Sequence, residues 1–287
     1  MKNVTGDKRY EDAISAWIVR HTVGFAHDTD DGAIAGGSGV LVRCRKIGGI
    51  LTCAHVLDDI LSHAKSNRDG KIGIVANGSS GSLLQRVHMK LSDFKSLPMI
   101  VKRGGVATER EQELGPDLGF VRLPETTMSA LEAIGSALDL DQQKTMRSPQ
   151  PRTGVVQALT LAVGNWAELV TVSEHSALNK VATFTTAIVS GEGRPESPHS
   201  GYDRFRLEVH PLESYPRSYA GLSGGGVWIV GLNTDDGKVT VVERRLVGIA
   251  YFQTGADNPS QRHILLHGPT SIYDQLLPEI ETLAATA

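Results

Sequence analysis

The sequence predicts an all-β protein that ends in a helix. Short apolar segments alternate with turn residues along most of the 287 residues, and 31 glycines suit a chain with many tight turns. Apolar residues recur at helical spacing in residues 269–287. With 40% hydrophobic residues, the chain can bury one large core or two smaller ones.

The first half of the chain shows a hairpin pattern and a later strand. Residues 36–42 predict one strand, residues 46–49 a turn and residues 50–52 the returning strand, so that His55 closes an apolar, strand-like run. In residues 115–123, turn residues come first, then an acid, then apolar residues at alternating positions, which again predicts a strand.

The second half is expected to start with a helix and continue in strands. Apolar residues at helical spacing between 126 and 144 predict a connecting helix: Met128, Leu131, Ile134 and Leu138. Strands are expected near residues 154–163, 169–172, 181–190, 205–210, 226–230, 238–243 and 246–252. The terminal helix begins at Pro269, and one apolar face holds Ile272, Leu276, Leu277, Ile280 and Leu283.

A glycine-rich turn around Ser223 is the strongest functional signal. It spans residues 221–226 and precedes the apolar residues 227–230. A hydroxyl attacks a carbonyl well only when preorganised NH donors meet the new oxyanion, and glycines let the backbone curl tightly enough to aim them. Ser223 is therefore a candidate nucleophile, with the NH groups of Gly221 and Ser223 as candidate oxyanion donors. A plain β-turn before a strand has the same pattern, so partners elsewhere must decide.

A candidate base and a candidate acid are present. His55 can serve as the base, although a lone histidine among apolar residues is more often a core residue. The acid that orients such a histidine is buried, and Asp117 fits because it opens an apolar strand. Most other acidic residues fall in polar or helical contexts and are expected to be solvated.

The order His55, Asp117, Ser223 resembles the trypsin and chymotrypsin clan of serine peptidases. Within it, residues 36–42, 51–56 and 117–121 are similar to bacterial HtrA-type and trypsin-2-type catalytic domains without a PDZ domain. The resemblance implies two six-stranded antiparallel β-barrels of the trypsin-like fold, with the active site between them and a C-terminal α-helix. It also implies a serine endopeptidase that works through an acyl-enzyme.

The resemblance further implies an order of segments along the chain. These are a lead-in (1–14), a first barrel with His55 and Asp117 (15–125), a connecting helix and linker (126–150), a second barrel with Ser223 (151–268) and the C-terminal helix (269–287). The spacings between the three candidate residues are longer than usual for the family. We therefore expect inserted loops near residues 62–70, 77–82, 101–113 and 191–202.

Two departures from the family pattern bear on regulation and on the acid. Leu222 stands where digestive members carry an acidic residue that pairs with a new N-terminus, so no activation by N-terminal trimming is expected. Residues 246–253 resemble the strand that binds substrate backbone. There, Ala250 or Tyr251 replaces a serine that touches the acid in the animal enzymes, so Asp117 needs support from elsewhere.

The substrate-binding residues implied by the resemblance are Arg217, Ser218, Tyr251, Phe252 and Gln253. The floor of the primary pocket falls about six residues before the nucleophile, at Arg217, which disfavours substrates with Lys or Arg at the cleavage site. Asp257, in a nearby loop, is an alternative border of the same pocket, and the register in this region is open.

Composition limits the expected partners. A net charge of −3 predicts no nucleic-acid and no membrane partner, and a protein or peptide is the expected substrate. The first residues do not resemble a signal peptide, so the chain is expected in the cytoplasm, with Cys44 and Cys53 reduced, although the two could face each other across the hairpin. The other histidines, His267 among them, show no metal-ligand spacing, so neither a metal nor another cofactor is predicted.

Three functional hypotheses follow from the sequence. The first is a serine endopeptidase. The second, from a different class, is a catalytically silent trypsin-like module that binds peptides or regulates. The third is an effector protease that stays inactive until an activating protein partner triggers it, which suits Leu222 and the long loops.

Overall fold

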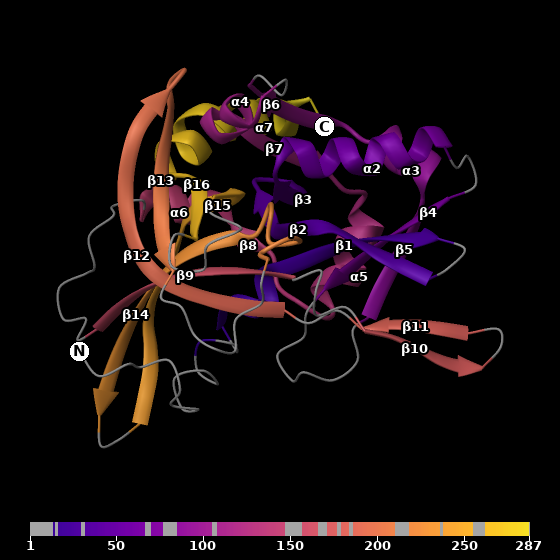
Figure 1. Ribbon diagram of the computed structural model, residues 1–287, viewed down its shortest axis with the longest axis horizontal. Helices are drawn as coiled ribbons and strands as arrows, with labels where there is room; N and C mark the ends of the chain where they lie inside the picture. The colour runs from indigo at the N-terminus through magenta and orange to yellow at the C-terminus, as the bar shows by residue number, and fades with distance from the viewer. Residues whose placement is uncertain are drawn as a thin grey trace.

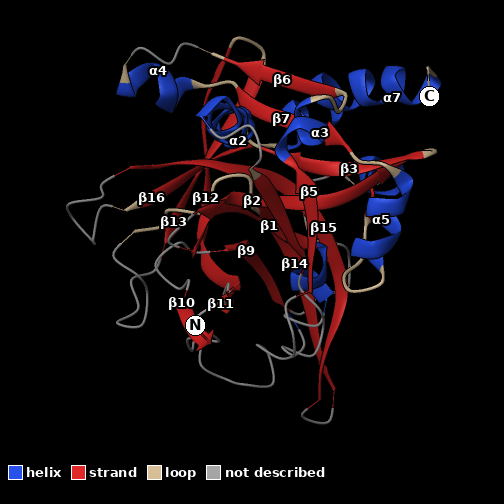
Figure 2. Cartoon of the chain, turned by 90° about the vertical axis from the view of Figure 1, so that its right-hand side faces the viewer, coloured by secondary structure: helices blue, strands red, loops and turns tan. Residues whose placement is uncertain are grey.

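The computed structural model describes residues 14, 17–29, 32–66, 70–76, 85–104, 108–146, 157–165, 171–176, 179–183, 186–209, 218–235, 238–254 and 262–286. The chain forms two β units, one from each half of the sequence (Figure 1). Most helices gather around the first unit, whereas the second is built mainly of strands (Figure 2). No helix among these residues has the length and apolar character needed to span a bilayer.

The first unit is an eight-stranded sheet in the order β5-β4-β1-β2-β3-β7-β6, with β8 paired in parallel to β2. Its strands are β1 (Thr22–Thr29), β2 (Gly32–Cys44), β3 (Ile47–Thr52), β4 (Lys71–Ala76), β5 (Gln85–Lys90), β6 (Met99–Arg103), β7 (Asp117–Arg122) and β8 (Leu138–Asp139). The helices α2 (Ala54–Ser66) and α3 (Leu91–Lys95) lie along one side of the sheet (Figure 1). The central strand β3 is buried along its whole length.

The second unit contains a closed antiparallel barrel of six strands in the order β12-β13-β16-β15-β14-β9. Its strands are β9 (Gln157–Asn165), β12 (Thr186–His199), β13 (Tyr202–Val209), β14 (Gly226–Asp235), β15 (Lys238–Thr254) and β16 (His263–His267). A separate hairpin consists of β10 (Thr171–Ser176) and β11 (Asn179–Thr183). Closure removes the exposed sheet edges that an open sheet would leave.

The predicted fold class is confirmed in its mainly β character, one six-stranded barrel and the C-terminal helix. The first sheet has eight strands, and pairing within the described residues does not join its end strands β5 and β6, so a second six-stranded barrel is not confirmed. The terminal helix comprises a π-helical segment, η4 (Ser271–Leu276), and α7 (Leu277–Ala285). Its predicted apolar face is in place: Ile272, Leu276, Leu277 and Ile280 are buried, and Leu283 packs against them.

The predicted hairpin has a tighter turn than expected. Arg45 and Lys46 form the turn, Arg45 has a φ of +52°, and Cys44 pairs with Ile47. Gly48 and Gly49 belong to β3, where they pair with Arg43 and Val42 of β2. Neighbouring atoms crowd both α-carbons, so a side chain would not fit. A Cβ on Gly48 would lie 2.5 Å from the Met128 side chain, and one on Gly49 would lie 2.2 Å from the Val121 carbonyl.

Several predicted elements differ in extent. The connecting helix is two helices, α5 (Glu125–Glu132) and α6 (Leu140–Thr145), because Leu138 pairs with Val42 and interrupts the helical path. The predicted strand at 181–190 is split between β11 and β12, while those at 238–243 and 246–252 are one strand, β15.

The predicted loops also proved partly wrong. Residues 191–202 continue β12, turn at Ser200 and Gly201 and enter β13, while residues 101–113 hold the end of β6 and most of α4 (Glu109–Leu114). The first residues of the predicted loop at 62–70 continue α2, and residues 77–82 lie outside the described residues.

The two cysteines are free and buried. Cys44 adjoins the hairpin turn, whereas Cys53 follows the far end of β3, because Val40 pairs with Leu51 in between. The suggestion that they could face each other across the hairpin was therefore wrong.

Candidate active site

The three candidate catalytic residues come from different elements. His55 lies in the first turn of α2, not at a strand end as expected, Asp117 is the first residue of β7, and Ser223 lies in the turn before β14. All three line one cavity of about 390 Å³. Tyr251 and Phe252 from β15 line it as well, so the cavity is bounded by both β units.

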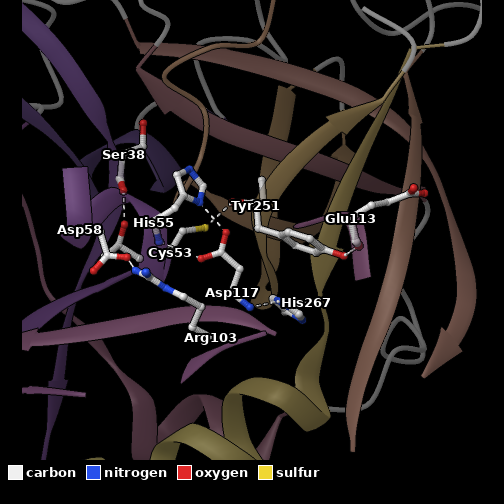
Figure 3. A network of polar contacts seen from close by, with 11 residues as sticks. Ser38, Cys53, His55, Asp58, Arg103, Glu113, Asp117, Tyr251 and His267 are labelled. Carbon is white, nitrogen blue, oxygen red and sulfur yellow. Dashed lines mark hydrogen bonds and ion pairs between the residues drawn. The ribbon is translucent and has the colours of Figure 1, made fainter. Parts of the chain in front are cut away.

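Two hydrogen bonds join His55 to Asp117. The His55 backbone NH donates to Asp117 Oδ1 at 2.9 Å, and the ring Nδ1 contacts Asp117 Oδ2 (Figure 3). With a proton on Nδ1, this contact leaves Nε2 of the neutral ring free to accept one. Asp117 is mostly buried, with its side chain 16% exposed, and the His55 side chain is 39% exposed. The acid is thus shielded while the imidazole reaches the cavity.

The surroundings of His55 set its proton affinity. Burial of the ring opposes protonation, but the hydrogen bond and the negative charge of Asp117, with a smaller contribution from Asp59, outweigh it and raise the pKa of His55 above 6.5. Arg103 acts in the opposite direction. His55 therefore stays charged to a higher pH than a free histidine.

His267, which shows no metal-ligand spacing in the sequence and has no predicted role there, supports the acid. Its Nε2 accepts a 2.9 Å hydrogen bond from the backbone NH of Asp117 (Figure 3). The ring is fully buried and stacks on Tyr251 with ring centroids 4.3 Å apart. Burial lowers the pKa of His267 to about 4, so the ring stays neutral and can keep accepting.

Tyr251, which stands near the place of the family's serine, therefore contacts the acid indirectly, through His267. Its hydroxyl donates to the Glu113 carbonyl at 2.6 Å, and Arg204 Nε donates to the same hydroxyl at 3.1 Å. These bonds hold the ring against His267 (Figure 3).

The turn that carries Ser223 has the backbone geometry for two free NH donors. Gly221 and Gly224 have φ values of +90° and +85°, a region that favours glycine. The NH of Gly224 donates to the Ala250 carbonyl at 2.8 Å, and the NH of Gly225 donates to the Leu222 carbonyl at 2.7 Å. The NH groups of Gly221 and Ser223 donate to no group among the described residues, so both are available to an oxyanion.

Ser38 on β2 connects this turn to the first sheet. Its Oγ donates to the Gly221 carbonyl at 2.6 Å, and its backbone NH donates to the Ser223 carbonyl at 2.8 Å. The same Oγ accepts from the Asn165 NH, and the Ser38 carbonyl accepts from Thr52 Oγ1 at 2.6 Å. In the sequence, Ser38 is only one residue of the predicted strand at 36–42. Four hydrogen bonds on one fully buried serine show that it is a junction between the two units.

Leu222 packs in an apolar cluster of the second unit that includes Val189, Leu207 and Val227. Its side chain is also close to Gly164, where an added Cβ would come within 2.7 Å. A charged residue at this position would have to be desolvated, so leucine fits the site.

Cys53 lies beside the His55 and Asp117 pair. Ligand atoms of the three residues lie within 4.8 Å of one another. Cys53 Sγ is fully buried and donates to the Ala250 carbonyl at 3.1 Å, and burial raises the pKa of the thiol well above its usual value. The sulfur is therefore a neutral thiol, and both oxygens of Asp117 are engaged by His55.

Some of the predicted substrate-binding residues line the cavity that contains Ser223, and others do not. Tyr251, Phe252 and Gln253 line the cavity of about 390 Å³, and Ser218 Oγ accepts from the Ala220 NH at 3.0 Å. Arg217 and the alternative Asp257 lie outside the described residues. The ion pair of Asp58 and Arg103 adds charge to the same cavity (Figure 3).

Comparisons with known proteins give distant structural matches. No protein-family model and no curated protein matches the chain. Two structures of the HtrA-type protease AlgW with a decapeptide match at 16% and 15% identity, with TM-scores of 0.47 and 0.44, and each match covers 95% of this chain and 67% of the other. A third match, at 11% identity, a TM-score of 0.41 and 90% coverage of each chain, concerns coupled folding and binding of the intrinsically disordered Sesbania mosaic virus VPg protein.

Proposed function

We propose that the protein is a serine endopeptidase that hydrolyses peptide bonds through an acyl-enzyme. The observation that carries the proposal is the paired hydrogen bonding of His55 to Asp117 on the wall of a cavity that Ser223 also lines. The free NH groups of Gly221 and Ser223 beside the nucleophile support it, because acyl transfer needs such donors.

The first half of the reaction forms the acyl-enzyme. His55 Nε2 accepts the proton of Ser223 Oγ as the oxygen attacks the peptide carbonyl carbon. The carbonyl oxygen becomes negative and receives hydrogen bonds from the NH groups of Gly221 and Ser223. Asp117 holds the imidazole in place and stabilises its positive form. His55 then gives the proton to the departing nitrogen, the C–N bond breaks, and the acyl group remains as an ester on Ser223.

The second half restores the enzyme. His55 takes a proton from water as the water oxygen attacks the ester carbonyl, and the same two NH groups receive the new oxyanion. His55 returns the proton to Ser223 Oγ as the C–O bond breaks. The products are a new carboxylate and a new amine. In each half-reaction His55 accepts one proton and gives it up again, so the ring ends in its starting protonation state.

A fluorophosphonate probe tests this proposal, because it reacts with an activated serine irrespective of substrate sequence. We expect labelling of Ser223 in the native protein, none in Ser223→Ala, and an unchanged rate in Ser92→Ala, a matched control on an exposed serine of α3. Labelling that persists in Ser223→Ala would contradict the proposal. Peptide binding without any labelling would favour the catalytically silent module instead.

Cellular location and triggering belong to the same proposal. Two free, buried cysteines suit a reducing compartment, so we place the enzyme in the cytoplasm. Labelling of the isolated protein that quickens on addition of a cell extract would support an activating partner, and an unchanged rate would contradict it.

A further inference from the structure

A second cavity, of about 660 Å³, lies on the first unit and contains none of the candidate catalytic residues. It lies where four segments meet: the turn between β2 and β3, the end of β7, the residues before β6 and the start of α5. From its charges and its apolar lining we infer that it binds an acidic peptide segment of a partner protein. This inference does not depend on the proposed function.

The cavity and the catalytic pair lie at opposite ends of the same two strands. β3 begins beside the cavity at Ile47 and leads towards His55, whereas β7 begins at Asp117 and ends beside the cavity at Arg122. A strand advances about 3.3 Å per residue, so Asp117 and Arg122 are about 17 Å apart along β7. A segment bound in this cavity therefore occupies a different site from a peptide at Ser223.

The charges of the lining favour an anion. Its described residues include three cations and one carboxylate, which gives a formal charge of +2. Arg43 is already engaged, because it donates to Glu125 and to Glu132, each at 2.6 Å. Lys46 and Arg122 form no ion pair with any carboxylate among the described residues, so both are available to an acidic ligand.

The rest of the lining is largely apolar. Ile47 and Leu123 are buried and line the cavity together with the half-buried Leu97 and two exposed prolines, Pro98 and Pro124. An apolar side chain that covers these residues removes their surface from water, which favours binding. The cavity thus suits a ligand that carries an apolar group beside negative charges.

Backbone hydrogen bonds hold the walls of the cavity. The Arg122 NH donates to the Pro98 carbonyl at 3.0 Å, and the Leu123 NH donates to the Gly48 carbonyl at 3.0 Å. The ring of each proline also restricts its backbone. Because these segments are already ordered, a ligand loses less free energy in fixing them than it would at a flexible surface.

An acidic peptide fits these features better than a nucleic acid does. One carboxylate can pair with Lys46, and another can form a bidentate contact with the planar guanidinium of Arg122. An apolar side chain between the two acids can then cover Ile47 and Leu123. A nucleic acid depends on the neutralisation of many phosphates, whereas this lining offers two cations that no described carboxylate occupies.

Fluorescent pentapeptides test the inference, with the full chain carrying Ser223→Ala so that no peptide is cut. We expect the peptide Glu-Asp-Leu-Glu-Asp to bind about tenfold more tightly than the uncharged Gln-Asn-Leu-Gln-Asn and than Glu-Asp-Ser-Glu-Asp, which lacks the apolar side chain. Equal affinity for either comparison peptide would overturn the inference. So would tighter binding of an oligothymidylate of the same charge, or no binding of the acidic peptide at about 1 mM.

Variants of the two available cations locate the bound peptide. Lys46→Gln and Arg122→Gln should each raise Kd about fivefold, and the double variant about twentyfold, because each loses a charged hydrogen bond. Lys71→Gln, at an exposed position of β4 outside the cavity, is the matched control and should change Kd less than about twofold. An unchanged Kd in the double variant would show that the peptide binds elsewhere and would refute the inference.

Salt provides a second measurement if the double variant does not fold. Raising the NaCl concentration from about 0.05 M to about 0.5 M screens charges at the surface, so the affinity of the parent chain for Glu-Asp-Leu-Glu-Asp should fall while that for Gln-Asn-Leu-Gln-Asn stays nearly constant. An affinity for the acidic peptide that does not respond to salt would contradict the role of Lys46 and Arg122.

Discussion

Replacing Gly224 by alanine tests the contact between the nucleophile turn and the first sheet, and Gly201 provides a matched control. Gly224 has a φ of +85° and Gly201, in the turn between β12 and β13, has a φ of +83°. The backbone strain of the two substitutions is thus nearly equal. Their surroundings differ: a Cβ on Gly224 would lie 2.0 Å from the Ser38 carbonyl oxygen, whereas the nearest atom to one on Gly201 is 3.9 Å away.

These distances set the expected loss of stability. In both variants, left-handed strain of roughly 1–2 kcal/mol is partly offset by about 0.4–1 kcal/mol from the stiffer unfolded chain, so Gly201→Ala costs about 1 kcal/mol. Gly224→Ala must also displace the Ser38 carbonyl and break its hydrogen bond from Thr52. The lost bond adds about 1 kcal/mol and the overpacking roughly 1–3 kcal/mol, for a total of about 3–5 kcal/mol.

Urea unfolding measures the difference, and fluorophosphonate labelling of the folded variants measures its effect on the site. A displacement of about 1 Å at a reacting group can lower a rate on the order of a hundredfold, so we expect Gly224→Ala to label at least about tenfold more slowly than Gly201→Ala. Equal losses of stability, or a native labelling rate in Gly224→Ala, would show that the turn does not rest on Ser38 and would refute the reasoning.

Three further predictions concern protons and hydrogen bonds. His55 must be neutral to accept a proton and its pKa is raised, so kcat/KM should fall as the pH decreases through a midpoint above 6.5. Asp117→Asn should lower both this midpoint and the rate. A midpoint at or below 6.5 in the native protein would contradict the assignment of His55 as the base. His21 and His267 both have a pKa lowered to about 4 by burial, so between about pH 6.5 and 4 they are protonated in the unfolded chain but not in the folded one. The free energy of unfolding therefore decreases as the pH falls through this range, by about 1.4 kcal/mol per pH unit for each histidine. His267→Gln, which keeps an acceptor for the Asp117 NH, should reduce that slope by about one proton in urea titrations, and an unchanged slope would count against a neutral His267. Ser38→Ala leaves the Gly221 carbonyl without its donor, so kcat should fall about tenfold or more with KM nearly unchanged, whereas a change confined to KM would exclude a role in the oxyanion turn.

The parts of the fold that were predictable from the sequence are those determined by patterns of neighbouring residues. Alternating apolar residues predicted β7 and most of the barrel strands, and helical spacing predicted the buried face of the terminal helix. The turn at Ser223 was recognisable because its glycines are needed for backbone conformations that other residues avoid, at Gly221 and Gly224.

The errors have physical causes that lie outside the local sequence. Gly48 and Gly49 resembled a turn, but they are strand residues because they pair with Arg43 and Val42 of β2. They are glycines because Met128 and Val121 leave no room for a side chain. Leu138 fitted a helical pattern, yet its pairing with Val42 makes it a strand residue. In both cases a distant neighbour along the chain overrides the local preference.

The same limit explains why the supports of the site were not predicted. His267 lies 150 residues from Asp117 in the sequence, and Ser38 lies 183 residues from Gly221. A histidine that accepts from a backbone NH needs no particular spacing, and a serine between two glycines has many uses. Neither residue has a motif of its own, so only the packing of the two units identifies its role.

The support from Ser38 bears on how the turn is ordered when Leu222 occupies the position before the nucleophile. A leucine cannot pair with a charged N-terminus, so the orientation of the Gly221 and Ser223 NH groups must depend on other contacts. Ser38 holds the Gly221 and Ser223 carbonyls, and Ala250 holds the Gly224 NH. The Gly225 NH holds the Leu222 carbonyl, whose peptide group carries the Ser223 NH. Since a peptide group is planar, fixing these carbonyls and the neighbouring NH restricts how the turn can rotate. Hydrogen bonds to uncharged groups of both β units therefore order the turn, and the apolar packing of Leu222 adds to them.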